Sequence, residues 1–392
     1  MKLKRLFILA FIGSACNQQY VVQGNALGTA AALNTNMMVV QVGNCGPYTY
    51  DNEPCVSVTI CTPGTTTCQT IPNILVDTGS YGLRIFSSAI SIGLTQETNS
   101  TGQAIGECAF FGSLNTWGQV QTADVILGGE KAPNVPIQVI NSAYAKTPAT
   151  CTTPATGPSD AGYNGILGVG LFNQDCGENC TTDATNEMYY ACTGTTCTNI
   201  TVTLAQQVSN PVVGLPLDNN GVSLQLPSVP LTGAPTVTGT LTLGIGTQAD
   251  NTPTGVTVYP ADTDGNFITV FGGKKYPTSF IDSGSNGLFF PAPTGLATCA
   301  SGTAGSGFFC PTPSANYTAT QEGSSGTPQN MISFEIYNAT DLVNTGNGVF
   351  PSFASSDTTE FDWGLPFFLG RTVYVGIEGT TSSIGSGPYW AY

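Results

Sequence analysis

The sequence predicts an all-β chain of two lobes with a cleft between them. Gly (48) and Pro (25) are frequent and accompany many Thr, Val and Ser residues, a composition typical of short strands joined by turns. No long stretch shows sustained helical periodicity. A short motif, in which apolar residues lead into Asp, a hydroxyl residue, Gly and Ser, occurs at residues 73–80 and again at 279–285. With 392 residues, the chain is long enough for two lobes of ordinary domain size.

Each copy of this motif ends in a candidate catalytic turn. The two turns are Asp77-Thr78-Gly79-Ser80 and Asp282-Ser283-Gly284-Ser285. We expect a buried strand to deliver each Asp, and the hydroxyl residues and glycines to support its carboxylate through short local hydrogen bonds. The glycines also allow two such turns to approach each other closely.

Two turns that meet face to face would bring Asp77 and Asp282 together. Like charges at that separation cannot both ionise, so the pair would hold one proton. One carboxylate could then act as a general base toward a water molecule, and the other carboxyl group as a general acid toward a substrate carbonyl. Asp77 and Asp282 are therefore the predicted catalytic residues.

An apolar-apolar-Gly element also recurs. It occupies residues 165–168 and 367–370, so that Gly168 follows Asp77 at nearly the same separation as Gly370 follows Asp282. This recurrence indicates a duplicated lobe.

With these motifs, the sequence resembles the pepsin-like aspartic peptidases over roughly residues 38–392. Segments 163–168, 239–244 and 363–371 add to the resemblance. The chain is more narrowly similar to an uncharacterised bacterial family of secreted or lipoprotein pepsin-like proteins. The resemblance implies a bilobal double β-barrel, with an N-terminal lobe at residues 38–213 and a C-terminal lobe at residues 214–392. It also implies an aspartic endopeptidase with an acid optimum that takes an extended peptide or unfolded protein, needs no cofactor and acts as a monomer.

Two positions depart from the family pattern around the hairpin that covers the substrate. Phe111-Gly112 stands where the family has Tyr-Gly, and Arg84 stands where it usually has Trp. Phe111 lacks a hydroxyl and Arg84 adds a cation near the expected cleft, so these three residues are candidates for flap and substrate contacts. Plain core packing of Phe111 is the alternative. The departures keep open a second function, a catalytically inactive pepsin-like protein of the cell envelope that binds peptides or proteins.

Composition excludes several other functions. The sequence has no His, so a Ser-His-Asp triad, a Cys-His pair and His-ligated metal sites are impossible. A carboxylate-ligated metal hydrolase ranks third, because the Asp turns offer few oxygen ligands, and we expect no metal. Lys and Arg total 9 against 24 Asp and Glu, which argues against a nucleic acid partner.

The N-terminus predicts export. Residues 1–15 contain basic residues, a short apolar run and small residues, the pattern of a signal peptide. The apolar run is too short to span a membrane. Cleavage before Cys16 would make this residue the lipidation site of a bacterial outer membrane lipoprotein, periplasmic or at the cell surface. An ordinary cut after Ala15, giving a secreted protein, is the alternative. Residues 16–37 are predicted to form a flexible tether.

The number of cysteines supports a protein whose thiols are paired in disulfides. Of 13 Cys, 12 remain after Cys16, enough for six disulfides. Close spacing predicts local pairs, namely Cys61 with Cys68, Cys192 with Cys197, and Cys299 with Cys310. Residues 171–200 hold four cysteines and are expected to form a disulfide-stapled surface insertion. A zinc site is the alternative for these four, Cys176, Cys180, Cys192 and Cys197.

Overall fold

The computed structural model describes residues 36–43, 45–47, 50–112 and 114–392, and these belong to one compact unit. The predicted signal peptide, the Cys16 lipidation site and residues 16–35 of the predicted tether lie outside the described residues. Within the described ranges, no helix is both long and apolar enough to cross a lipid bilayer.

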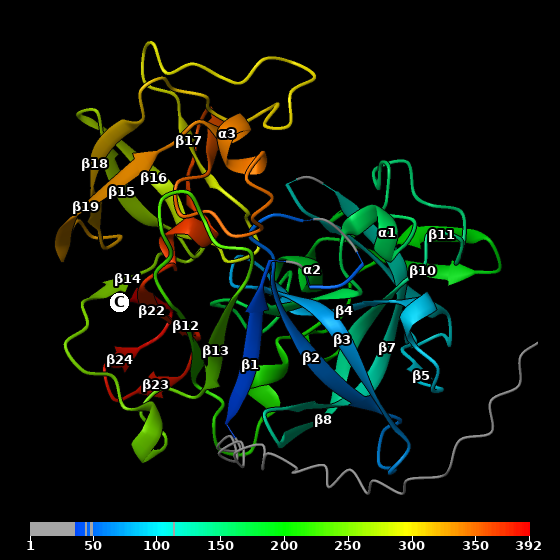
Figure 1. Cartoon of the computed structure of the whole chain (residues 1–392). Coiled ribbons are helices and arrows are strands. Elements are labelled where there is room, and N and C mark those ends of the chain that lie inside the picture. The colour runs from blue at the N-terminus through cyan, green and yellow to red at the C-terminus, as the bar shows by residue number, and fades with distance from the viewer. Residues whose placement is uncertain (1–35, 44, 48–49, 113) are drawn as a thin grey trace, which may run out of the picture. The chain divides into compact units, whose positions relative to one another are not determined.

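The prediction of an all-β fold is confirmed, because strands dominate and the helices are single turns (Figure 1). The helices are α1 (Pro158–Ala161), α2 (Asn179–Thr182) and α3 (Ala339–Val343), with 3-10 turns η1 (Ser87–Ala89), η2 (Leu204–Gln206), η3 (Pro211–Gly214), η4 (Ala249–Asn251) and η5 (Leu365–Phe367).

Most strands of the described chain belong to two large sheets. The larger sheet contains β1 (Met37–Val42), β2 (Pro54–Cys61), β3 (Cys68–Asp77), β4 (Tyr81–Phe86), β5 (Thr95–Gln96), β6 (Ala104–Phe110), β7 (Asn115–Leu127), β8 (Glu130–Ile140), β9 (Gly165–Val169), β10 (Tyr189–Thr193), β11 (Thr196–Asn199), β12 (Gly221–Leu226), β13 (Val237–Leu243), β14 (Val258–Pro260), β22 (Arg371–Gly376) and β25 (Tyr389–Ala391). The second contains β15 (Phe267–Phe271), β16 (Lys274–Ile281), β17 (Leu288–Pro291), β18 (Ala315–Glu322), β19 (Gln329–Ile336), β20 (Ala354–Asp357) and β21 (Phe361–Trp363), and β23 (Thr381–Ser382) pairs with β24 (Gly385–Ser386).

Strand β1 joins the two halves of the chain. It pairs along its whole length with β13, from Met37 opposite Thr242 to Val42 opposite Val237. The two strands lie side by side in Figure 1, β1 in blue and β13 in green. Because β2 pairs with the other edge of β1, strands from both predicted lobes share one continuous sheet. Strand β3, which leads to Asp77, belongs to this sheet, whereas β16, which leads to Asp282, belongs to the second sheet.

The same three-strand arrangement surrounds each Asp turn. In the first half, β9 lies parallel to β3 with Gly168 opposite Asp77, and antiparallel to β4. In the second half, β21 lies parallel to β16 and antiparallel to β17, and the Asp282 N–H donates to Trp363 O at 3.1 Å. The structural counterpart of Gly168 is therefore Gly364.

The predicted partner element at residues 367–370 is wrong. Phe367 ends the 3-10 turn η5, and Gly370, with φ of +80°, lies in the turn before β22. The predicted element was defined by apolar residues, whereas the true partner strand β21 contains an acidic residue, Asp362.

All twelve cysteines of the described chain form disulfides, as the parity argument predicts. The pairs are Cys45–Cys55, Cys61–Cys68, Cys108–Cys151, Cys176–Cys180, Cys192–Cys197 and Cys299–Cys310. The zinc alternative is wrong, because its four thiols are consumed in two disulfides. The segment at residues 171–200 is more than a surface insertion, because its strand β10 pairs with β6 and so belongs to the larger sheet.

Candidate active site

Two equivalent turns present the candidate catalytic carboxyl groups. The buried residues Ile74 to Val76 lead β3 into Asp77, and Ile281 ends β16 directly before Asp282. In the first turn, the Gly79 N–H donates to Asp77 Oδ1 (2.8 Å) and the Ser80 hydroxyl donates to Oδ2 (2.6 Å).

The second turn repeats this pattern atom for atom. The Gly284 N–H donates to Asp282 Oδ1 (2.7 Å) and the Ser285 hydroxyl donates to Oδ2 (2.8 Å). Each carboxyl group therefore has one backbone and one hydroxyl donor, which orient it and stabilise its ionised form.

Thr78 and Ser283 hold the two turns together. The Thr78 hydroxyl donates to Ile281 O (2.9 Å) and accepts from the Ser283 N–H (2.9 Å). The Ser283 hydroxyl donates to Val76 O (2.6 Å) and accepts from the Thr78 N–H (3.1 Å). Both side chains are buried. The expectation that these two hydroxyls hold the carboxylates is wrong, because that role falls to Ser80 and Ser285.

The glycines allow the carboxyl groups to meet. A Cβ atom placed on Gly79 would lie 2.6 Å from Asp282 Cγ, and one on Gly284 would lie 2.8 Å from Asp77 Cγ. Real Cβ atoms do not approach so closely, so any side chain at either position would displace the opposite carboxyl group.

The side chains of Asp77 and Asp282 face each other, at a separation where their carboxyl groups can share a hydrogen bond. Such a bond requires one of the two carboxyl groups to carry a proton. Burial raises the pKa of Asp77 well above its ordinary value, and the charge of Asp282 and this hydrogen bond raise it further, against smaller opposing effects of Ser80 and Gly79. The arrangement is a pair of neighbouring carboxyl groups, a buried one on Asp77 and a half-buried one on Asp282, and the raised pKa of Asp77 favours a proton shared between them.

The hairpin formed by β6 and β7 carries Phe111 and Gly112 at its tip, where the Phe111 N–H donates to Leu114 O (2.9 Å). The half-buried Phe111 packs with Leu114 against a cluster that includes Ile166 and Tyr163, and Gly112 is exposed. Phe111 thus serves partly as core packing.

Arg84 is not a cleft cation, so that expectation is wrong. Its side chain is 2% exposed and forms ion pairs with Glu107 (2.7 Å) and Asp175 (2.6 Å), both of them buried. The guanidinium carbon lies 5.6 Å from the centroid of the Phe111 ring. Arg84 therefore supports the hairpin residue from within the protein and links it to the segment that contains Asp175.

Sequence analysis missed Tyr50, which lies beside the carboxyl pair. Its hydroxyl donates to Gly284 O (3.4 Å), and its ring contacts Tyr163 edge-on with centroids 6.4 Å apart. Burial raises the pKa of Tyr50, and the charges of Asp282, Glu53, Asp77 and Asp362 add to this effect. Tyr50 lies between Cys45 and Cys55, and the short spacing of these two cysteines is a sequence signal for a local disulfide.

Two further carboxyl groups near Tyr50 were also missed. Glu53 is fully buried, neither of its carboxyl oxygens has a hydrogen-bond partner, and burial raises its pKa to about 8. Asp362 is 6% exposed with Oδ1 unpartnered. Within the described residues, no three His, Cys, Asp or Glu side chains are arranged to hold a metal ion.

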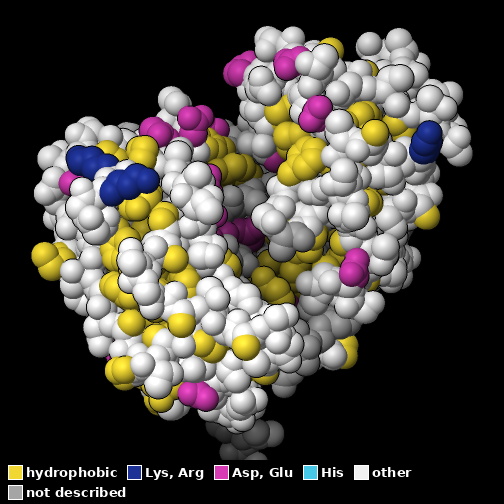
Figure 2. All heavy atoms as spheres, turned by 90° about the horizontal axis from the view of Figure 1, so that it is seen from above, with side chains coloured by type: hydrophobic (Ala, Val, Ile, Leu, Met, Phe, Trp, Pro, Cys, Tyr) yellow, Lys and Arg dark blue, Asp and Glu magenta, His cyan; other side chains and the backbone are white. Residues whose placement is uncertain are grey.

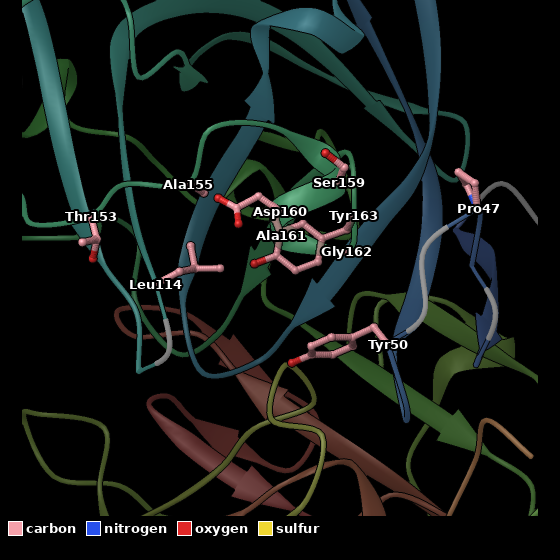
Figure 3. A pocket seen from close by; sticks show the side chains of 10 residues that line it. All are labelled: Pro47, Tyr50, Leu114, Thr153, Ala155, Ser159, Asp160, Ala161, Gly162 and Tyr163. Atoms are coloured by element: carbon pink, nitrogen blue, oxygen red, sulfur yellow. The ribbon is translucent and has the colours of Figure 1, made fainter. Parts of the chain in front are cut away.

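A cavity of about 560 Å³ adjoins Tyr50. In Figure 3, Tyr163 lies between Leu114 of the hairpin and Tyr50. The other lining residues are Pro47, Thr153, Ala155, Ser159, Asp160, Ala161 and Gly162. Figure 2, a view from above relative to Figure 1, shows a central depression with acidic side chains on its floor and hydrophobic side chains on its walls. Neither Asp77 nor Asp282 lines the cavity, and Tyr50 connects the two, since it lines the cavity and bonds to Gly284 O. The candidate active site is the carboxyl pair, with the hairpin and this cavity beside it.

The two sheets and the paired turns form a bilobal pepsin-like fold. The crystal structure of an aspartic proteinase from Irpex lacteus is similar, with a TM-score of 0.52 and 14% sequence identity, over 91% of this chain and 96% of that chain. At this identity, the likeness concerns the fold. The chain belongs to the family described as "Protein of unknown function (DUF3443)", whose model matches residues 30–392. No curated protein matches the chain.

Proposed function

We propose that the protein is an aspartic-type endopeptidase. The observation that carries the proposal is the facing pair of Asp77 and Asp282, presented by two turns with the same donor pattern. A pair of neighbouring carboxyl groups that holds one proton provides a general acid and a general base at one point.

In the proposed reaction, the ionised carboxylate takes a proton from a water molecule, whose oxygen bonds to the peptide carbonyl carbon. The protonated carboxyl group gives its proton to the carbonyl oxygen, which yields a gem-diol. The C–N bond then breaks as the nitrogen takes the proton that came from water, and a diol hydroxyl returns a proton to the second carboxyl group. The pair regains its starting state without a covalent intermediate.

The surroundings of the pair favour an extended peptide or an unfolded protein as substrate. An extended chain offers backbone groups to the hairpin edge and side chains to the cavity. The hydroxyl that Phe111 lacks at the hairpin is available from Tyr50, whose phenol faces the carboxyl pair from another segment. The acidic chain, with 24 Asp and Glu against 9 Lys and Arg, makes nucleic acid an improbable partner, and we propose a monomer without a cofactor.

The direct test is cleavage of a denatured protein at about pH 4, where a carboxyl pair is expected to share a proton. Wild type should cleave, whereas Asp77→Asn and Asp282→Asn should each abolish cleavage. Asp264→Asn, a matched change at an exposed turn, should leave cleavage intact. Cleavage that survives in both pair variants would refute the proposal.

The second candidate is a catalytically inactive envelope protein that binds peptides or proteins. It is favoured by Phe111, which removes the hairpin hydroxyl of the family pattern. Capture of a peptide without cleavage across the range of carboxyl titration, about pH 2 to 7, would favour this function.

We also propose export with a lipid anchor at Cys16, either periplasmic or at the cell surface. The six disulfides support an oxidising compartment and account for every cysteine except Cys16. Mass spectrometry of the mature N-terminus would test this. A mature chain that begins elsewhere, or an unmodified Cys16, would exclude the anchor.

A further inference from the structure

The two halves of the site differ at one equivalent position. Ile166 lies opposite Leu75, two residues before Asp77, and Asp362 lies opposite Phe280, two residues before Asp282. The register is the same in both lobes, so an acidic residue in the second lobe stands where the first has isoleucine.

Asp362 faces the carboxyl pair rather than the core of its own sheet. Its neighbours Phe361 and Trp363 stack on each other with centroids 4.5 Å apart, inside the aromatic core. Side chains of a strand alternate between faces, so Asp362 points to the opposite side. There it contacts Ser285, the residue whose hydroxyl donates to Asp282 Oδ2 (2.8 Å).

This placement is costly for the fold. A buried carboxyl oxygen without a partner destabilises a protein, and Asp362 is 6% exposed with Oδ1 unpartnered. The isoleucine at the equivalent place in the first lobe indicates that an apolar residue fits this register. Costs of this kind are concentrated at functional sites.

We propose that Asp362, in its protonated form, is a positioning residue for Asp282: it donates its hydrogen to Ser285 Oγ and thereby commits the Ser285 hydroxyl to Asp282 Oδ2. An ionised Asp362 would instead accept the Ser285 hydrogen and compete with Asp282 for it. The first lobe has no such arrangement, because Ser80 donates to Asp77 Oδ2 with apolar Ile166 in the equivalent place. This chain of hydrogen bonds from Asp362 through Ser285 to Asp282, called the relay below, has no counterpart at Asp77. The two carboxyl groups of the pair therefore have different surroundings.

The charges around Asp362 favour its protonated form. Burial is the largest effect and raises the pKa of Asp362 well above its ordinary value, and the charge of Asp282 raises it further. Asp77 and Glu360 add smaller increases, whereas the hydrogen bond with Ser285 lowers the pKa. Tyr50 also faces Asp362, whose charge raises the pKa of this phenol. No Lys or Arg is among the groups that shift its pKa.

An infrared experiment tests the relay without requiring activity. We would compare the C=O stretch of protonated carboxyl groups in wild type, Asp362→Asn and Ser285→Ala at about pH 6, well above the ordinary pKa of Asp. Wild type should show one band that Asp362→Asn lacks, and Ser285→Ala should shift that band. The matched control Glu360→Gln, on an exposed neighbour, should leave it in place. Absence of the band from wild type, or a band indifferent to Ser285→Ala, would overturn the proposal.

A kinetic test depends on the proposed peptidase function. Asp362→Ile introduces the first-lobe residue and removes the donor, whereas Asp362→Asn keeps a donor. We expect kcat of Asp362→Ile to be about tenfold below that of Asp362→Asn, with similar KM, from the loss of one hydrogen bond to a charged group. Equal kcat values would contradict the relay. If wild type cleaves nothing, the peptidase proposal fails alone, and the infrared test still decides the relay.

The pH profile separates positioning from a simple charge effect. If protonated Asp362 is required, Asp362→Asn cannot lose that proton, so its activity should persist to the same or a higher pH than in wild type. If Asp362 only adds charge, its removal lets the pair lose its proton earlier, and activity would end at a lower pH. The second result would overturn the proposal.

Discussion

Replacing Ser283 by alanine tests the contact that joins the two turns. The variant loses the hydrogen bond from Ser283 Oγ to Val76 O (2.6 Å) and deprives the Thr78 N–H of its acceptor (3.1 Å). Both side chains are buried, so water cannot substitute for the missing hydroxyl. Two lost bonds at about 1 kcal/mol each, together with a buried donor left unsatisfied, predict a loss of about 2–4 kcal/mol in the free energy of unfolding.

The assay is urea unfolding of Ser283→Ala beside a matched control, Ser279→Ala. Ser279 is also fully buried, but its hydroxyl makes one local bond, to Tyr276 O (2.9 Å), so its loss should cost about 1 kcal/mol. We also expect kcat of Ser283→Ala to fall, because the two carboxyl groups lose their fixed separation. A Ser283→Ala variant no less stable than Ser279→Ala would refute the reasoning.

Three further changes probe the site. Gly79→Ala should abolish cleavage while the protein remains folded by circular dichroism, because its Cβ would lie 2.6 Å from Asp282 Cγ; an active variant would show that the pair can separate. Tyr50→Phe should lower kcat/KM about tenfold in a peptide cleavage assay, through loss of one hydroxyl, and wild-type kinetics would exclude a role for this phenol. Burial raises the pKa of Glu53 from 4.5 to about 8, so the folded protein keeps a proton that the unfolded chain has lost. Glu53 alone should therefore lower the free energy of unfolding, measured with urea, by at most about 1.4 kcal/mol per pH unit across that window. Glu53→Gln should reduce the overall slope by this share, to which Asp77 and Asp362 also contribute; an unchanged slope would refute the assignment.

Local signals predicted the central turns well. The apolar run, Asp, hydroxyl residue, Gly and Ser are adjacent in sequence, and the bonds from Gly79 and Ser80 to Asp77 are equally local. Three disulfides, Cys61–Cys68, Cys192–Cys197 and Cys299–Cys310, were predicted for the same reason, since each joins cysteines no more than 11 residues apart.

Long-range contacts explain what the sequence analysis could not predict. Arg84 has its charge partners in distant segments, Glu107 and Asp175, so its burial was not visible in the sequence. The role of Tyr50 depends on Gly284, which is 234 positions away. The partner strand of Asp282 was missed because Asp362 breaks the apolar pattern that defines such a strand elsewhere.

Neutron diffraction from crystals at acid pH tests the central claim most directly, because it locates hydrogen atoms. We predict a single hydrogen between the carboxyl groups of Asp77 and Asp282. Two carboxylates without a hydrogen between them, or two side chains separated by more than a hydrogen bond, would contradict the account.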